Sequence, residues 1–231
     1  GIPHNSAHGQ VFGYDGMRLE ATLGLADGGA MQVRRRKGRG RTLADGGKLA
    51  LYPEGGDLVA GLATRLYFEA RTPKGKPADV AGRVVDGSGA VLARFRTEHE
   101  GRGRVAFTPQ KAGRAYTVAL DEPAGVTDLY ALPEVLKEGF VVTPLADTFR
   151  AGRPVKLTVS STAAGEARVA LSLRERELAS CPLDLRAGEP HEVVLTPPRT
   201  ADGVARVTVY DAAGMPRAER LVFLRPEREL A

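Results

Sequence analysis

The sequence predicts an all-β protein with two antiparallel β-sandwich domains in tandem, preceded by a β-hairpin extension. Short runs of alternating apolar and polar residues recur along the chain, and turn signals rich in Gly and Asp separate them about every eight to twelve residues. The length of 231 residues suits two sandwiches of about 100 residues each plus an extension. The predicted limits are 1–46 for the extension, 47–140 for the first sandwich and its joint, and 141–231 for the second sandwich.

The composition supports a packed core and excludes a disulfide-stapled one. Apolar residues make up 42% of the chain and Trp is absent, so Val, Leu, Ala and Phe must fill the interior. Cys181 is the single cysteine, so no intrachain disulfide can form. The net charge of +5 is uneven: residues 1–46 hold seven basic against four acidic side chains, whereas the remainder is almost balanced. Such a distribution does not indicate a folded nucleic-acid-binding face.

Residues 1–46 carry the predicted hairpin and a basic run. Apolar and polar side chains alternate from Met17 to Leu25, which is typical of a half-buried strand, and Met31–Val33 begins the expected returning strand. We interpret the basic run as a solvated strand end or linker, with contact to a polyanion or an anionic membrane as the alternative. Its cations are Arg34, Arg35, Arg36, Lys37, Arg39 and Arg41.

The segment from Leu51 to Pro109 has the densest strand and turn signals. In its central strand Leu66 and Phe68 are predicted to face inward, and Tyr67 and Glu69 outward. Further strands follow, with a hairpin at Asp86–Gly89 between two of them. The side chains expected to point inward there are Val80, Gly82, Val84, Val91, Ala93, Phe95, Val105, Phe107, Tyr116, Val118 and Leu120. Tyr116, at the head of a strand, is expected to fix a loop through its hydroxyl, as a tyrosine corner does.

Residues 121–140 are predicted to form a packed joint with one helical turn at most, and the strand scheme then repeats. Five strands and a hairpin at Asp211–Gly214, which leads to a last strand, are expected in the second sandwich. The strands are predicted at 140–143, 155–159, 167–173, 192–195 and 204–210, with the last at 220–224. The hairpin repeats the strand, Asp-x-x-Gly, strand pattern found at Asp86, and common hairpin geometry explains that similarity without shared descent.

Several motifs resemble one bacterial family. The segment Leu-Tyr-Pro-Glu-Gly-Gly-Asp-Leu-Val-Ala-Gly-Leu at 51–62 is similar to a Pro-Glu-Gly-Gly-Asp segment of bacterial macroglobulin-like domain proteins. The Gly-x-Gly-x-x-x-Phe-Thr-Pro pattern at 101–109 and the closing pattern at 209–223 follow in the order expected for that family. The resemblance covers roughly residues 49–224, and residues 1–46 lie outside it.

The resemblance implies a pair of immunoglobulin-like, macroglobulin-type β-sandwiches that belong to a larger secreted or cell-envelope protein. Family members with a reactive thioester carry Cys-Gly-Glu-Gln, whereas here Cys181 precedes Pro182. Covalent trapping is therefore not implied for this chain.

Residues that can carry chemistry are few, and each has a structural interpretation. His99 lies between Glu98 and Glu100, but in an extended strand His99 points away from both, so we expect a surface strand end and no metal site. Glu54 and Asp57 share a Gly-rich loop that offers too few oxygens for calcium. Cys181 lacks a neighbouring cation or helix N-terminus and is expected to be a small half-buried residue. No catalytic, metal or cofactor residue is predicted.

The sequence therefore predicts a non-enzymatic structural and protein-interaction module of an extracytoplasmic protein, with neighbouring domains or another envelope protein as its partner. The alternative is a module that binds a glycan or polyanion through one sandwich end or through the Arg34–Arg41 run, accessory to an enzyme. No transmembrane segment and no specific nucleic-acid partner are predicted.

Overall fold

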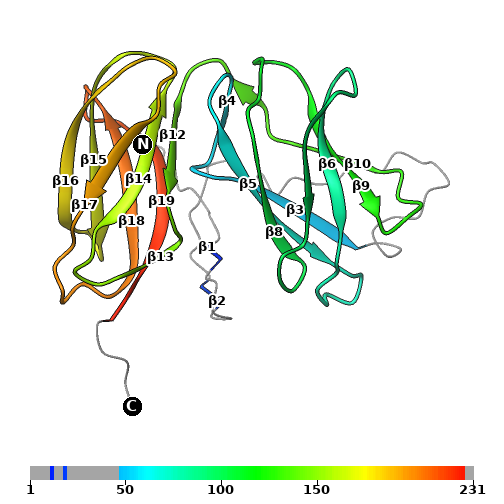
Figure 1. Cartoon of the computed structure of the whole chain (residues 1–231), viewed down its shortest axis with the longest axis horizontal. Helices are drawn as coiled ribbons and strands as arrows, with labels where there is room; N and C mark the ends of the chain where they lie inside the picture. The colour runs from blue at the N-terminus through cyan, green and yellow to red at the C-terminus, as the bar shows by residue number, and fades with distance from the viewer. Residues whose placement is uncertain (1–10, 13–17, 20–46, 227–231) are drawn as a thin grey trace, which may run out of the picture. The chain divides into compact units, whose positions relative to one another are not determined.

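The computed structural model describes residues 11–12, 18–19 and 47–226, and every regular element in them is a β-strand. The chain forms two compact units, Gly29–Lys137 and Glu138–Ala231 with Gly1–Gly28. Figure 1 shows their strands. Among the described residues, no helix has the length and apolar character needed to cross a membrane. The all-β prediction is confirmed, and the exact domain limits stay a prediction.

Only one short strand pair is described in the N-terminal extension. β1 (Val11–Phe12) pairs antiparallel with β2 (Arg18–Leu19), which lies within the predicted strand Met17–Leu25. The predicted returning strand Met31–Val33 lies outside the described residues, so that pairing is not tested.

The first sandwich packs two sheets over one core. β3, β5 and β8 form a three-stranded antiparallel sheet, and the order β10-β9-β6-β7 forms the facing sheet. A separate parallel pair joins β4 to β11. The strands are β3 (Lys48–Pro53), β4 (Leu58–Val59), β5 (Thr64–Arg71), β6 (Ala81–Asp86), β7 (Val91–Arg96), β8 (Arg102–Phe107), β9 (Tyr116–Glu122), β10 (Leu129–Ala131) and β11 (Val135–Leu136).

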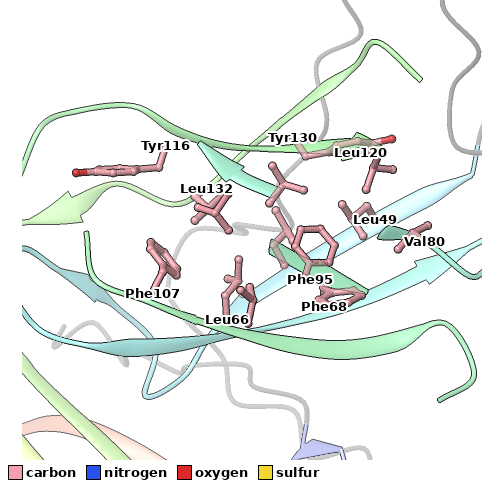
Figure 2. Packing of buried hydrophobic residues seen from close by; sticks show 14 of the residues in the cluster. Leu49, Leu66, Phe68, Val80, Phe95, Phe107, Tyr116, Leu120, Tyr130 and Leu132 are labelled. Atoms are coloured by element: carbon pink, nitrogen blue, oxygen red, sulfur yellow. The ribbon is translucent and has the colours of Figure 1, made fainter. Parts of the chain in front are cut away.

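The predicted alternation places the core of this sandwich correctly. Leu66 and Phe68 in β5 are 0% and 1% exposed, whereas Tyr67 and Glu69 point outward and are half-buried. Figure 2 shows aromatic rings meeting between the sheets, where the centroids of Phe68 and Phe95 lie 4.7 Å apart. Such a tilted pair stabilises a core by about 0.5–1.5 kcal/mol beyond its buried area.

The prediction that Val91 points inward with Ala93 is wrong. A β-bulge changes the register between β6 and β7: Val84 lies opposite Ala93, whereas the next residue, Val85, lies opposite Val91. The extra residue, Leu92, reverses the alternation beyond it. Val91 is consequently 45% exposed, and Leu92 packs against the core instead.

Residues 121–140 supply strands of the first sandwich. β10 pairs with β9, and β11 pairs with β4, so this segment closes the sheets. Tyr130 and Val135 are 3% and 1% exposed, which agrees with the expectation that the segment is packed. No helical turn is present there.

The second sandwich repeats the arrangement. β12, β14 and β17 form one antiparallel sheet in the order β12-β14-β17, and the facing sheet has the order β13-β19-β18-β15-β16. Val142, Val169, Val207 and Leu224, all fully buried, belong to its core. The strands are β12 (Phe140–Pro144), β13 (Thr148–Arg150), β14 (Val155–Ser161), β15 (Gly165–Leu173), β16 (Arg176–Leu185), β17 (His191–Leu195), β18 (Gly203–Asp211) and β19 (Pro216–Arg225).

Two of these strands were not predicted from the sequence. β13 has only three residues and no buried one. β16 is an edge strand in which most side chains are exposed or half-buried, and it contains Pro182, which an edge strand tolerates. Alternation of buried and exposed residues is the signal that both strands lack.

The two Asp-x-x-Gly hairpins share the same hydrogen bonds, as their common sequence pattern predicts. Asp86 Oδ1 accepts the backbone N–H groups of Ser88 and Ala90 at 2.8 and 3.1 Å. Asp211 Oδ1 accepts those of Ala213 and Met215, both at 2.9 Å. Each carboxylate accepts backbone N–H groups that have no partner in the neighbouring strand, and these hydrogen bonds fix the conformation of the short turn.

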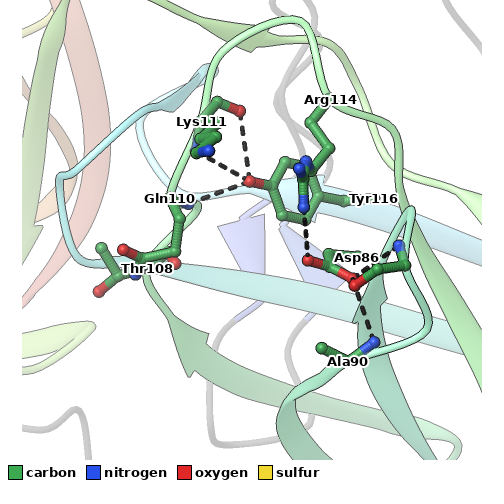
Figure 3. A network of polar contacts seen from close by, with 8 residues as sticks. Asp86, Ala90, Thr108, Gln110, Lys111, Arg114 and Tyr116 are labelled. Carbon is green, nitrogen blue, oxygen red and sulfur yellow. Dashed lines mark hydrogen bonds and ion pairs between the residues drawn. The ribbon is translucent and has the colours of Figure 1, made fainter.

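Tyr116 forms the predicted tyrosine corner. Its ring is 2% exposed, and its hydroxyl accepts the backbone N–H groups of Gln110 and Lys111, both at 3.0 Å, and donates to the carbonyl oxygen of Lys111 at 3.2 Å (Figure 3). Arg114, two residues before the tyrosine, donates to Asp86 Oδ2 at 3.0 Å. The loop before β9 is thereby tied to the β6–β7 hairpin at one end of the sandwich.

Candidate functional site

The outer face of the β3–β5–β8 sheet gathers tyrosine and arginine side chains. The register places Tyr52 of β3 opposite Tyr67 of β5, and Tyr67 opposite Arg104 of β8. Because Leu51 and Phe68 point into the core, these three side chains share the opposite face. Four more side chains of the face bear charge, namely Lys48, Arg65, Glu69 and Arg71 from β3 and β5, and Arg102 adds a further cation from β8.

Glu69 holds two of the arginines on this face. Arg71 donates to Glu69 Oε1 at 2.5 Å, and Arg102 donates to the same oxygen at 3.2 Å. Burial by itself raises the pKa of Glu69, but the hydrogen bonds from Arg71 and Arg102 outweigh it and lower the pKa below its ordinary value. The carboxylate is therefore ionised at neutral pH, and the two guanidinium groups are fixed in orientation.

Glu54 orients a third arginine at the end of β3. Its side chain is fully buried, and Arg65 donates through Nε to Glu54 Oε2 at 2.7 Å. Tyr67 donates its hydroxyl proton to the other carboxylate oxygen at 3.4 Å. Since Glu54 is engaged by these partners, its carboxylate serves the fold of the sheet end.

Tyr52 stays protonated on this face. Burial raises its pKa, and the negative charge of Glu69 raises it further. A neutral phenol can donate a hydrogen bond and offers a ring for stacking. Arg104 is the most exposed arginine of the face, 40% exposed and 4.0 Å from Glu98. Chemically, the face combines two phenol rings with guanidinium groups, a combination suited to an anionic ligand.

The six basic residues singled out in the sequence, Arg34, Arg35, Arg36, Lys37, Arg39 and Arg41, lie outside the described residues. The structure therefore does not test the predicted polyanion contact. We call the outer face of the β3–β5–β8 sheet the Tyr–Arg face. It was not predicted from the sequence, although the alternation of Tyr67 and Glu69 with Leu66 and Phe68 already places its central residues outward. The missing information was the register that brings three strands together.

His99 lies at the surface, as predicted, but the reason given for it was wrong. His99–Arg102 forms a turn in which Glu100 has a φ of 47°, so the strand alternation does not apply. His99 Nε2 lies 4.0 Å from Glu100 Oε1, with the two side chains 71% and 58% exposed. Within the described part of the chain, no group of three His, Cys, Asp or Glu side chains is placed to hold a metal ion.

Cys181 is half-buried in the edge strand β16, as expected. Its thiol donates to the carbonyl oxygen of Pro182 at 3.3 Å.

The second sandwich has a hollow of about 300 Å³ at the end of the β14–β15 connection. Phe140, Ser161, Gly165 and Asp211 are among the residues that line it. The Ser161 hydroxyl accepts the N–H of Ala163 at 3.1 Å, and the Asp211 carboxylate binds its own turn. The Ser161 hydroxyl and the Asp211 carboxylate thus already serve the fold.

Comparisons with known proteins give short or distant matches. A family model described as an AAA domain matches residues 1–71, which is less than half of the chain. Within that range, residues 48–71 form β3, β4 and β5 of the first sandwich. No curated protein sequence matches the chain.

Three solved structures are similar to this chain at low sequence identity. A biofilm-associated protein BSP domain is 14% identical, with a TM-score of 0.39, and the match covers 79% of this chain and 30% of that one. Surface layer protein SbsC, domains 4–9, is 13% identical with a TM-score of 0.38, covering 78% and 31%. Native Escherichia coli alpha-2-macroglobulin is 14% identical with a TM-score of 0.33, covering 85% and 15%. This chain thus spans less than a third of the length of each of these three structures.

Proposed function

We propose that the chain is a non-enzymatic structural and protein-interaction module of a larger bacterial macroglobulin-like protein in an extracytoplasmic compartment. The observation that carries the proposal is that each sandwich has its own closed core and hydrogen-bonded hairpins. A unit with fixed turns and a separate core holds its neighbours in the chain at a defined separation. The ordered motifs at 51–62, 101–109 and 209–223 support the family part of the proposal.

A domain replacement in the full-length gene product tests this role. Residues 47–226 are exchanged for two unrelated sandwiches of the same length, and the product is followed by protease accessibility on intact and permeabilised cells. A spacer role predicts that the rest of the protein stays outside the cytoplasm and works normally with the replacement. An interaction role predicts normal placement with loss of partner binding. A full-length product found only with a cytosolic marker contradicts the proposal.

The Tyr–Arg face favours a second candidate, the binding of a polyanion or an acidic glycan. The face has five cationic side chains and two carboxylates, those of Glu54 and Glu69, so its charge is positive. The cations are Lys48, Arg65, Arg71, Arg102 and Arg104. Charge complementarity of this kind gives affinity that falls as salt rises. The Arg34–Arg41 run adds six cations to the same chain.

Retention on a heparin column, eluted with a salt gradient, tests the second candidate. Changing Arg34, Arg35 and Arg36 to Ser tests the run, and Arg104→Ser tests the face. Arg176→Ser, on the exposed edge strand β16, removes the same charge elsewhere and serves as the control. Elution at lower salt for the run or face variant, but not for R176S, assigns the contact. Equal elution of all variants contradicts a specific site.

A further inference from the structure

Each sandwich pairs a segment near its beginning in parallel with its final strand. In the first sandwich, β4 is parallel to β11, with Leu58 opposite Val135 and Val59 opposite Leu136. In the second, β13 is parallel to β19, with Phe149 opposite Leu224 as the central pair. We call these pairs, β4–β11 and β13–β19, the first and second clamps (Figure 1).

The strand before each clamp segment belongs to a different sheet from the clamp. β3 pairs antiparallel with β5, and the chain then crosses to β4. β12 likewise pairs antiparallel with β14 before the chain crosses to β13. The beginning of each sandwich is thus held by two different neighbours: β5 or β14 pairs with its first strand, and the last strand pairs with the clamp segment.

Parallel pairing decides how a pull on the two ends is resisted. The chain enters a sandwich before the first clamp strand and leaves after the last strand, so tension pulls the two strands in opposite directions along their axes. Strands that slide past one another must break their hydrogen bonds together. In a pull across a sheet, by contrast, the bonds at the near end break first and the strand peels off one pair at a time.

The second clamp has the more extensive set of bonds. Beyond its three opposed pairs, Phe223 donates its N–H to the carbonyl of Asp147, and Ala151 donates to the carbonyl of Arg225, both at 2.8 Å. Arg220 binds Asp147 at 2.6 Å, with side chains 9% and 12% exposed. The first clamp has two opposed pairs and one flanking bond, from Ala60 N–H to the carbonyl of Leu136 at 2.9 Å.

The first clamp compensates in part by its burial. Leu58, Val59 and Val135 are 0%, 0% and 1% exposed, although Leu136 is 38% exposed, so water reaches the first of its two opposed pairs poorly and is slow to replace a broken hydrogen bond there. The number of bonds nevertheless favours the second clamp, which has more backbone hydrogen bonds and an ion pair between its two segments.

From this geometry we infer that both sandwiches are tension-bearing units, each locked by its clamp, and that the second unfolds at the higher force. The inference deepens the proposed structural role and rests on it for its biological use. The class of partner is a pair of anchored neighbours in the same protein chain that transmit a pull through residues 47–226.

A comparison of pulling directions tests the inference without any change in stability. The full chain is held in single-molecule force spectroscopy once by its two termini and once by Cys181 and the C-terminus. Cys181 is the chain's single cysteine and lies in β16, at the opposite edge of the sheet from β13. Pulling by the termini is expected to give two unfolding events, and pulling from Cys181 a markedly lower force for the second sandwich. Equal forces in the two directions overturn the inference.

A matched pair of variants locates the resistance. Ala151→Pro removes the donor to Arg225, and the residue before it is in a strand, which is the conformation that proline requires of its predecessor. Leu145→Pro likewise removes one backbone donor, to the carbonyl of Lys156 in the β12–β14 sheet, and the residue before it also lies in a strand. A151P is expected to raise the unfolding rate of the higher-force event about fivefold at fixed load, the effect of one hydrogen bond.

The outcomes separate this inference from the proposed function. L145P is expected to leave the higher-force event unchanged, and A151P to leave the lower-force event unchanged. If A151P does not alter either force, or if L145P weakens the sandwich as much, the clamp is not the element that resists. If A151P does not fold, the comparison of pulling directions on the unaltered chain still decides. The domain replacement described above can succeed or fail independently of either result.

Discussion

Replacing Tyr116 by Phe isolates the contribution of the tyrosine corner to the first sandwich. The ring is 2% exposed and packs in the core, and phenylalanine keeps that packing. The substitution removes only the hydroxyl, which makes three hydrogen bonds to the backbone of Gln110 and Lys111.

The size of the effect follows from those three bonds. A protein hydrogen bond contributes about 1 kcal/mol net, so the three together contribute at most about 3 kcal/mol. Gln110 and Lys111 are exposed residues, and water can partly replace the lost hydroxyl. We therefore expect the free energy of unfolding to fall by about 2 kcal/mol. For a domain of this size the melting temperature should fall by about 10 °C.

Differential scanning calorimetry of the whole chain measures the shift. The transition of the first sandwich is identified as the one that Phe68→Ala lowers, because Phe68 lies only in that core. Tyr210→Phe is the matched control in the second sandwich. Its ring lies 4.8 Å from the Arg168 guanidinium, and its hydroxyl has no hydrogen bond within the described residues. A shift in Y116F no larger than that in Y210F would refute the assignment of the corner as a structural tie.

Three further changes are predicted. Gly82→Ala should cost about 1–3 kcal/mol because its Cβ would lie 2.5 Å from the carbonyl oxygen of a neighbouring strand, whereas Gly87→Ala, with 3.6 Å to the nearest atom, should melt almost unchanged. Acid titration should weaken the first sandwich between about pH 4 and pH 2, because hydrogen bonds from the Ser88 side chain and backbone lower the pKa of Asp86 to about 2. The ionised Asp86 stabilises the folded state fully above the pKa of the unfolded chain, and this stabilisation is lost as the pH falls through the folded-state pKa. Asp86→Asn should flatten that part of the pH profile. Glu54→Ala should lower the free energy of unfolding by about 3 kcal/mol in denaturant titrations because it removes a fully buried carboxylate that binds both Arg65 and Tyr67.

The sequence predicts the strands that alternate and misses those that do not. β5 shows the clearest pattern, buried at every second residue from Thr64 to Ala70, and its prediction is confirmed. β16 is longer but lies at a sheet edge, so neither of its faces is consistently buried. Apolar and polar residues alternate in a strand when one of its faces is buried. An edge strand need not have a buried face, so its sequence need not alternate.

The candidate site was less accessible to sequence reasoning than the core. The outward direction of Tyr67 follows from the alternation within one strand, but its neighbours Tyr52 and Arg104 come from β3 and β8. Their alignment depends on the register across the sheet, which residues far apart in sequence determine together. A single sequence does not reveal such pairing.

The two sandwiches have similar strand orders without similar sequences. Their one shared sequence pattern, Asp-x-x-Gly, lies at different positions in that order. In the facing sheets, β10 lies beside β9 and β19 lies beside β18. The hairpin pairs β6–β7 and β15–β16 come next in the order. The Asp86 hairpin joins β6 to β7, whereas the Asp211 hairpin joins β18 to β19, which is a different position in that order. The shared Asp-x-x-Gly pattern therefore reflects the needs of a tight turn and does not mark equivalent sites. Both clamps pair an early segment with the last strand of the sandwich, although β13–β19 is part of the facing sheet and β4–β11 is a separate pair, and β4 and β13 share no sequence pattern. Parallel pairing of an early segment with the last strand requires only that their backbone groups meet. It can therefore form without a sequence pattern, and a search for such clamps in related chains must compare strand topology.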